Sequence, residues 1–263
     1  MDSLPRDRMP ESAGPRREAG AFAGFVLLDA PQWDPDRFCD DWRREWQTPV
    51  DWACKDGTLI GEINGMTAAV SLMPAPVPGG EAERNAATNY LWPQAAETVR
   101  NHVAHLLVAV LPRGGPALEA GRLFVQLGST CLAQPHALGF YASGTVFEPG
   151  FYREAAGVIR SGDLPLLNWV FIGLCRTRAG VCAYTSGMTA FGKREMEVLN
   201  SRAAPKELRD FLLDIVHYVL SDDVTLQDGE TIGFSAEQKL PITLSEGILA
   251  EGDSLKIAYL PAD

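Results

Sequence analysis

Four histidines and a scatter of acidic residues are the side chains of this sequence that could do acid–base or metal chemistry. His102 and His105 would share a face on a helix, but their surroundings favour a strand, which would point them to opposite faces. A metal site needs sufficient ligands in the right geometry, and no third ligand accompanies this pair. His217 lies in an apolar helical run, where a packed or helix-end role is expected. His136 follows a proline in a loop, so the histidines predict neither a metal site nor a general base.

Two glycine-rich stretches, Gly187–Gly192 and Asp228–Ser235, resemble phosphate-binding loops at first sight. The first lacks the spacing of a phosphate loop, although Lys193 follows its second glycine, and no Ser or Thr follows the lysine. The second has no basic residue and no helix starting behind it. Both stretches are better explained as bulges and turns beside strands.

The acidic residues indicate an exposed edge more than a catalytic pair. Glu195 and Glu197 alternate along a predicted strand and would share one face. Four further acids gather before Thr231, without the spacing of a calcium-binding EF-hand. These are Asp222, Asp223, Asp228 and Glu230. We interpret the acids of both groups as a solvated acidic rim, and the four as candidate partner-binding residues. The sequence predicts no catalytic residue, no metal and no cofactor.

The net charge of −11 bears on the class of partner. It repels a phosphate backbone, so nucleic acid is not an expected ligand. Complementary potential speeds encounters between oppositely charged proteins, so the charge favours a basic protein partner, although solubility alone also explains it. No apolar run approaches the roughly 20 residues needed to span a bilayer, so no membrane partner is expected.

The first twenty residues contain arginines and prolines but no apolar core of a signal peptide, and they predict a disordered tail. The chain has five cysteines at irregular spacing: Cys39, Cys54, Cys131, Cys175 and Cys182. An odd number without a signal peptide favours reduced thiols and a cytoplasmic location.

The hydrophobic patterning predicts alternating strands and helices over residues 21–163. An apolar strand at Gly24–Asp29 precedes a helix that Asp34 would cap, and an Asn64-Gly65 turn would join two strands. The order of strand, helix, two strands, helix and strand is that of a ferredoxin-like unit. The remaining predicted elements are strands at Thr58–Asn64, Met66–Met73, His102–Leu111, Leu138–Tyr141 and Thr145–Phe147, and helices after Pro93, over Pro116–Gln134 and from Pro149.

A boundary at Asp163–Pro165 would separate this half from a second one over residues 164–263. The second half is predicted to contain strands at Asn168–Thr177, Gly180–Gly192 and Glu195–Leu199, and a helix at Pro205–Leu220. The tetrapeptide Gly65–Ala68 recurs as Gly187–Ala190, so two related halves are one alternative, and chance is the other. The sequence thus predicts an α+β fold with mixed, largely antiparallel sheets covered by helices.

Several motifs are similar to those of a bacterial domain of unknown function, number 4261. They are Trp169-Val-x-Ile-Gly-Leu174, Thr185-x-Gly-Met-Thr-Ala-Phe-Gly192, Glu195-x-Glu-Val198, Leu208-x-x-Phe-Leu-x-x-Ile215, Tyr218-Val-Leu220, Asp228-Gly-Glu-Thr-Ile-Gly-Phe-Ser235 and Gln238-Lys239. Gly24–Leu28, Ala137–Tyr141 and Pro149–Tyr152 extend the resemblance toward the N-terminus. The resemblance implies a cytoplasmic bacterial protein. It also implies a loose association with gene neighbourhoods that encode toxins or secretion systems. It implies no activity, cofactor or catalytic residue.

Three functions remain in view. The first is a non-enzymatic binding protein, such as an immunity protein or adaptor, that binds a basic toxin or a secretion-system component through its acidic surface. The second is a small-ligand sensor or enzyme with a site between the halves. Its candidate ligand-binding residues are Tyr141, Tyr184, Thr189 and Ser235. The third is an assembly role through self-association.

Overall fold

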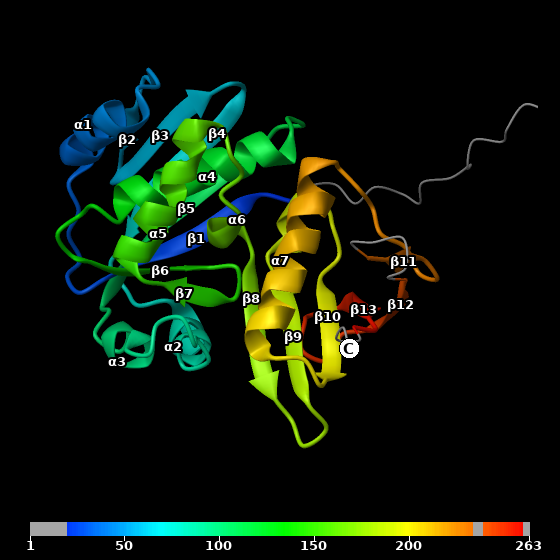
Figure 1. Ribbon diagram of the computed structural model, residues 1–263. Helices are drawn as coiled ribbons and strands as arrows, with labels where there is room; N and C mark the ends of the chain where they lie inside the picture. The colour runs from blue at the N-terminus through cyan, green and yellow to red at the C-terminus, as the bar shows by residue number, and fades with distance from the viewer. Residues whose placement is uncertain (1–19, 234–238, 260–263) are drawn as a thin grey trace, which may run out of the picture.

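The computed structural model of the chain describes residues 20–233 and 239–259. The predicted tail lies outside these residues, except for Gly20, and so does Ser235. The described chain folds into two β-sheets with helices packed on them (Figure 1), which confirms the predicted α+β class.

The first sheet has seven strands in the order β2-β3-β4-β5-β1-β6-β7, and every neighbouring pair is antiparallel. Its central strands are apolar on both faces, as expected for strands that helices cover on each side. The strands are β1 (Phe22–Leu28), β2 (Ala53–Lys55), β3 (Thr58–Ile63), β4 (Met66–Met73), β5 (Ala104–Leu111), β6 (Ala137–Ala142) and β7 (Thr145–Phe147).

Two groups of helices accompany this sheet. The long helix α4 (Ala117–Cys131) packs on β1 and β5 and contacts α1 (Pro35–Trp46) and α5 (Pro149–Ala156). The short helices α2 (Glu81–Ala86) and α3 (Ala95–Val99) form a separate apolar cluster with residues of β1, β6 and β7. The 3-10 turns η1 (Pro78–Gly80) and η2 (Gly157–Ser161) precede α2 and follow α5.

Two local predictions for this half are confirmed. The Asp34 carboxylate accepts the backbone N–H of Arg37 at 3.0 Å, and Pro35 occupies the first turn of α1. Asn64 and Gly65 have φ values of 51° and 76°, and they close the β3–β4 hairpin. Both features are local. The helix cap needs one side chain near the first N–H groups of the helix, and the hairpin turn needs two neighbouring residues that tolerate a positive φ.

The ferredoxin-like strand order is wrong. That order places β4 beside β1 and makes β1 parallel to β3, whereas β5 lies between β4 and β1, and β1 runs opposite to β3. The chain between β4 and β5 forms two helices of six and five residues instead of one crossover helix. Hydrophobic periodicity shows which face of a strand is buried but does not choose its neighbour.

The second sheet has six strands in the order β11-β12-β13-β10-β9-β8, and it is antiparallel except for the parallel pair β10–β13. Helix α7 (Pro205–Ser221) packs on β8 and β9 (Figure 1). The strands are β8 (Phe171–Arg176), β9 (Val181–Ser186), β10 (Met196–Ser201), β11 (Thr231–Ile232), β12 (Leu240–Glu246) and β13 (Asp253–Ile257). The predicted mixture of parallel and antiparallel pairing is confirmed.

Two predicted strands are shorter than expected. The residues before β8 form the one-turn helix α6 (Leu166–Trp169), and those after β9 form the 3-10 turn η3 (Met188–Phe191). Gly187 has φ of 123°, and a Cβ there would meet the Trp169 carbonyl oxygen, so the chain must turn at this glycine. Gly65–Ala68 therefore enters a strand whereas Gly187–Ala190 enters a 3-10 turn, and this tetrapeptide does not mark a structural repeat.

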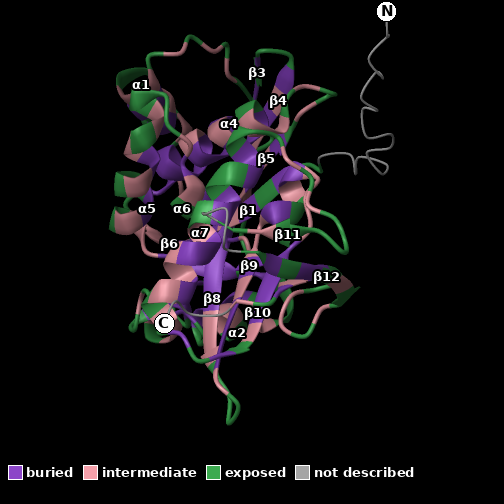
Figure 2. Ribbon diagram, turned by 45° about the vertical axis from the view of Figure 1, so that its right-hand side comes forward, coloured by how far each residue is buried: buried purple, intermediate pink, exposed green. Residues whose placement is uncertain are grey.

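A single apolar core joins the two sheets. Phe191 of η3 contacts Phe22 of β1 and Trp169 of α6, with ring centroids 5.2 and 4.8 Å apart. Gly121 of α4 leaves the space for this junction, because a Cβ there would lie 2.9 Å from the Phe191 ring and 3.0 Å from the Trp169 ring. Figure 2 shows that many residues of the central strands in both sheets are buried.

Candidate functional site

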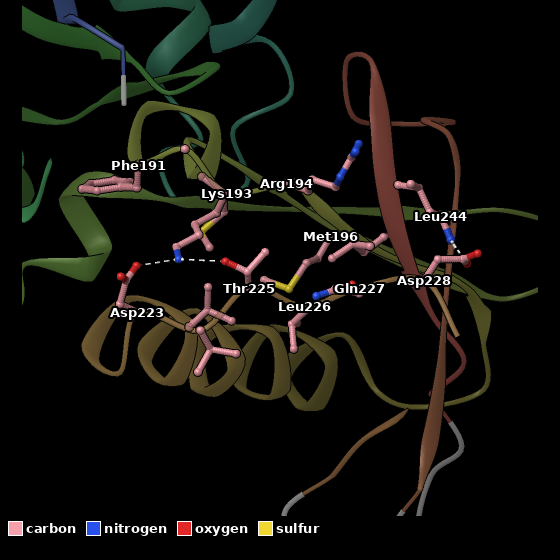
Figure 3. A pocket seen from close by; sticks show the side chains of 15 residues that line it. Phe191, Lys193, Arg194, Met196, Asp223, Thr225, Leu226, Gln227, Asp228 and Leu244 are labelled. Atoms are coloured by element: carbon pink, nitrogen blue, oxygen red, sulfur yellow. Dashed lines mark hydrogen bonds and ion pairs between the residues drawn. The ribbon is translucent and has the colours of Figure 1, made fainter. Parts of the chain in front are cut away.

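A cavity of about 490 Å³ opens where η3 and β10 face the end of α7. Its size is within the range of roughly 300 to 1,000 Å³ that small-molecule sites occupy. The lining residues are Met188, Phe191, Gly192, Lys193, Arg194, Met196, Val219, Asp223, Val224, Thr225, Leu226, Gln227, Asp228, Leu244 and Leu255. They come from η3, β10, the residues between these two elements, α7, β12, β13 and the segment that follows α7 (Figure 3).

The floor of the cavity is apolar. Met188, Met196 and Leu255 are buried in the core, and Leu226 and Leu244 are half-buried against it. Methionine side chains are flexible and polarisable, so such a floor can adapt to apolar groups of different shape. The floor can therefore accept an aliphatic or aromatic group.

Lys193 supplies the charge inside the cavity. Its ammonium group lies 2.7 Å from a carboxylate oxygen of Asp223 and 3.5 Å from the Thr225 hydroxyl, and it points toward both (Figure 3). The Lys193 side chain is only 10% exposed, whereas that of Asp223 is 65% exposed. The lysine thus holds the segment after α7 against η3, with its partner acid at the solvent side.

The four acids predicted to bind a partner are all exposed, and Asp223 and Asp228 border the cavity. Asp228 accepts the Leu244 N–H at 2.8 Å, and Glu230 accepts the Gln227 N–H at 2.8 Å. These two acids therefore also hold the segment 222–230 in shape, and Asp222 lies beside Asp223 at its start. The structure brings the four together as one exposed acidic segment.

Glu195 is not part of a solvated rim. Its carboxylate is buried and accepts the Thr185 hydroxyl at 2.6 Å and the N–H groups of Gly187 and Thr189 at 2.9 and 3.2 Å. Burial raises the pKa of the Glu195 carboxyl, and the hydrogen bonds from these groups oppose that effect. Glu195 thus organises the turn at η3.

Glu197 is also buried, with a side chain that is 0% exposed. It accepts the N–H groups of Ile248 and Ala250 at 3.1 and 2.8 Å, and Lys256 lies 3.0 Å away. Burial raises the pKa of this carboxyl, but the bonds from Ala250, Leu249, Lys256 and Ser254 outweigh burial and lower it to about 2. Glu195 lies one residue before β10 and is covered at η3, whereas the loop 247–252 covers Glu197, so the expectation of a solvated acidic face was wrong for both residues.

The predicted ligand-binding residues lie apart from the cavity. Tyr141 is buried in β6, where its hydroxyl accepts an N–H of the Asn85 side chain at 3.1 Å. Tyr184 of β9 lies over Gly173 of β8, and Thr189 of η3 donates its backbone N–H to Glu195. None of the three lines the cavity, and Ser235 is outside the described residues.

His102 and His105 serve the fold. His102 precedes β5 instead of lying in it, and its Nε2 accepts the Val77 N–H at 3.0 Å while its Nδ1 lies 2.6 Å from the Val99 carbonyl oxygen. Burial lowers the pKa of His105, whose Nδ1 lies 2.8 Å from the Ala75 carbonyl oxygen. His217 is exposed one turn before the end of α7, so it is not packed. Within residues 20–233 and 239–259, no three His, Cys, Asp or Glu side chains are grouped as metal ligands would be.

The part of the chain that contains the cavity matches a known family. Residues 184–258 match the family described as a domain of unknown function, DUF4261. This region is similar to DUF4261. Every residue that lines the cavity lies within it.

The matched region runs from β9 to β13 and includes α7. No curated protein and no solved structure matches the chain. None of the helices in the described part of the chain is both long and apolar enough to cross a membrane.

Sequence reasoning missed the basic and apolar parts of the cavity. Lys193 was considered only for a phosphate loop, and Leu226 and Leu244 carried no signal of a site. One signal was present, because Val224 and Leu226 are apolar residues within the acidic segment between Asp222 and Glu230. An apolar residue within an exposed acidic segment indicates that the segment folds back onto a core.

Proposed function

We propose that this chain is a non-enzymatic cytoplasmic bacterial protein that binds a basic protein partner, as an immunity protein or an adaptor of a toxin or secretion system would. The observation that carries the proposal is the exposed acidic segment 222–230 at the mouth of an apolar-floored cavity. Stable binding sites combine a buried apolar anchor with a surrounding polar rim. A partner arginine or lysine suits this combination, with its apolar stem against the floor and its positive end on the exposed acids, away from Lys193.

The acidic residues support binding more than catalysis. Glu195 and Glu197 are committed to backbone N–H groups, and Asp228 and Glu230 accept backbone N–H groups while remaining exposed. Exposed acids around a site raise the rate of encounter with a basic partner. The toxin or secretion-system context comes from the family resemblance, which is an associational argument.

Co-purification with the products of neighbouring genes tests this function. We expect one basic product to bind the full chain, and the Asp222→Lys/Glu230→Lys variant to weaken binding about tenfold or more, because these charges face the partner. Asp51→Lys/Glu62→Lys is the matched control, since it makes the same change in net charge at exposed positions in the first half. Equal weakening by both variants, or protection of cells from the product without binding it, would exclude this acidic site.

A small organic ligand is the second candidate for the same cavity. The cavity volume of about 490 Å³ and the apolar cavity floor favour binding of a small organic molecule. A thermal-shift screen of small amphipathic molecules tests it, with Met196→Trp as a variant that fills the floor. A ligand that stabilises the parent chain and the filled variant equally does not occupy this cavity.

A further inference from the structure

The hairpin that joins β8 to β9 projects beyond the rest of the second sheet (Figure 1), and its tip is exposed (Figure 2). The tip carries Arg176 and Arg178, and both side chains are exposed. A third exposed arginine, Arg202, follows β10, whose Ser201 pairs with Val181 at the base of the same tip. Three arginines thus gather at one end of a chain whose net charge is −11.

The tip is held in one conformation. The Thr177 hydroxyl accepts the N–H groups of Ala179 and Gly180 at 3.1 and 3.2 Å and lies 2.9 Å from the side-chain oxygen of Asn200. Gly180 has φ of 154°, and a Cβ there would meet the Ser201 carbonyl oxygen at 2.5 Å. A hairpin fixed in this way loses little conformational entropy when it binds.

The three arginines have no acidic partner in the described part of the chain, where no ion pair involves Arg176, Arg178 or Arg202. Other cations of the same half are paired: Lys193 with Asp223, Lys206 with Asp210, and Lys256 with Glu197. The tip is therefore a basic surface whose charge the described fold does not neutralise.

An acidic surface lies at the other end of α7. The helix begins just after Arg202 and ends at Ser221, where the acidic segment 222–230 starts (Figure 1). Its 17 residues span about 25 Å, which is well beyond the Debye length of about 8 Å at physiological salt. The two surfaces therefore act as separate local charges of opposite sign.

We propose that the arginine tip of one copy binds the acidic segment 222–230 of a second copy. Charge complementarity points to this occupant, since the segment carries four exposed acids, of which Asp223 also pairs with Lys193, and the tip carries three exposed arginines. The contact joins different surfaces of the two copies, so it is heterologous and can extend beyond a dimer. The inference stands apart from the proposed function, because the purified chain alone tests it, while a basic partner would compete for the same acids.

Sedimentation velocity of the full chain measures this association. At about 50 mM salt we expect the average mass to rise with protein concentration, and to return to that of one chain at about 500 mM salt, where the Debye length falls to a few ångströms. Arg176→Glu/Arg178→Glu should weaken association about tenfold or more. Arg100→Glu/Arg113→Glu, which makes the same charge change at exposed positions elsewhere, should associate like the parent.

A charge swap separates a specific contact from a general effect of charge. Neither Arg176→Glu/Arg178→Glu nor Asp222→Lys/Glu230→Lys should associate alone. A mixture of the two should form a complex, because the unchanged tip of one variant meets the unchanged segment of the other, and the two reversed surfaces also have opposite charge. A parent chain that stays at the mass of one copy at all concentrations and salts overturns the proposal. Association that the tip variant retains, or a mixture that forms no complex, also overturns it.

Discussion

Glu195 and Glu197 lie two positions apart and are both buried, yet the fold shifts the pKa of their carboxyl groups in opposite directions. Burial dominates at Glu195, whereas hydrogen bonds and Lys256 dominate at Glu197. The same residue type therefore has opposite effects on the pH dependence of folding, because the sign depends on whether the fold favours the neutral or the charged form.

Glu197→Gln should lower the free energy of unfolding at pH 7 by about 2 to 3 kcal/mol, because it removes a charge that the fold stabilises enough to lower its pKa to about 2. The parent chain should have this contribution in full above the ordinary glutamate pKa and lose it as the pH falls toward the folded-state pKa of about 2. Urea unfolding between pH 3 and pH 7, read by tryptophan fluorescence, measures both effects. An equal loss at every pH would show that the charge of Glu197 is not responsible.

Glu195→Gln should change stability at pH 7 by no more than about 1 kcal/mol, since glutamine resembles the neutral carboxyl and can keep the same N–H donors. The raised pKa makes the carboxyl stabilising below the ordinary glutamate pKa, and this stability declines as the pH rises through the folded-state value. As the pH rises, the free energy of unfolding of the parent should therefore fall relative to that of Glu195→Gln. The opposite trend would mean that Glu195 is held as a stabilised anion.

The β8–β9 pair depends on one glycine. Gly173 faces Tyr184 across the pair, and a Cβ at Gly173 would overlap the tyrosine ring. The ring of Tyr184, a predicted ligand-binding residue, covers the backbone of the neighbouring strand. A strand glycine with an aromatic neighbour is a packing pair, and neither residue can change alone without cost.

Gly173→Ala should destabilise the chain by about 1 to 3 kcal/mol, which is typical of overpacking. The double variant Gly173→Ala/Tyr184→Ala should be less destabilised than the sum of the two single changes, because the truncated side chain leaves room for the new methyl group. Thermal and urea unfolding of the parent, the two single variants and the double variant measures the four stabilities of this double-mutant cycle. Additive effects would show that the ring does not limit the space at Gly173.

The two sheets share one core, in which Phe191 and Trp169 of the second half meet Phe22 and Gly121 of the first. Two hydrogen bonds reinforce this junction. Tyr90 donates its hydroxyl to the Ile172 carbonyl oxygen at 2.8 Å, and Ser143 donates to that of Trp169 at 2.9 Å. Elements that bury apolar surface against each other tend to unfold together.

We therefore expect one unfolding transition for the described chain, with the same midpoint by tryptophan fluorescence and by far-UV circular dichroism. Gly121→Val should lower that midpoint by both probes, at a cost of about 1 to 3 kcal/mol, because its side chain would collide with Phe191 and Trp169. Glu119→Val on the exposed side of α4 is the control. Two separated transitions, with only one moved by Gly121→Val, would show that the halves unfold independently.

The sequence by itself determined the features that a few neighbouring residues control. Asp34 and Pro35 start α1, Asn64-Gly65 closes a hairpin, and the apolar spacing of Pro205–Leu220 predicts α7 to within one residue. It also identified the four acids that gather after α7. Local hydrogen bonds, allowed φ values and helical periodicity need no knowledge of the rest of the chain.

Only the tertiary structure decided the strand order, the burial of two glutamates and the cavity. Glu197 binds N–H groups more than fifty positions later in the chain, at Ile248 and Ala250, so its neighbours in sequence give no sign of its environment. Lys193 meets Asp223 and Thr225 in the same way, across 30 and 32 positions. The period of a strand fixes which side chains share a face, but the partner that covers that face is chosen by the whole packing arrangement.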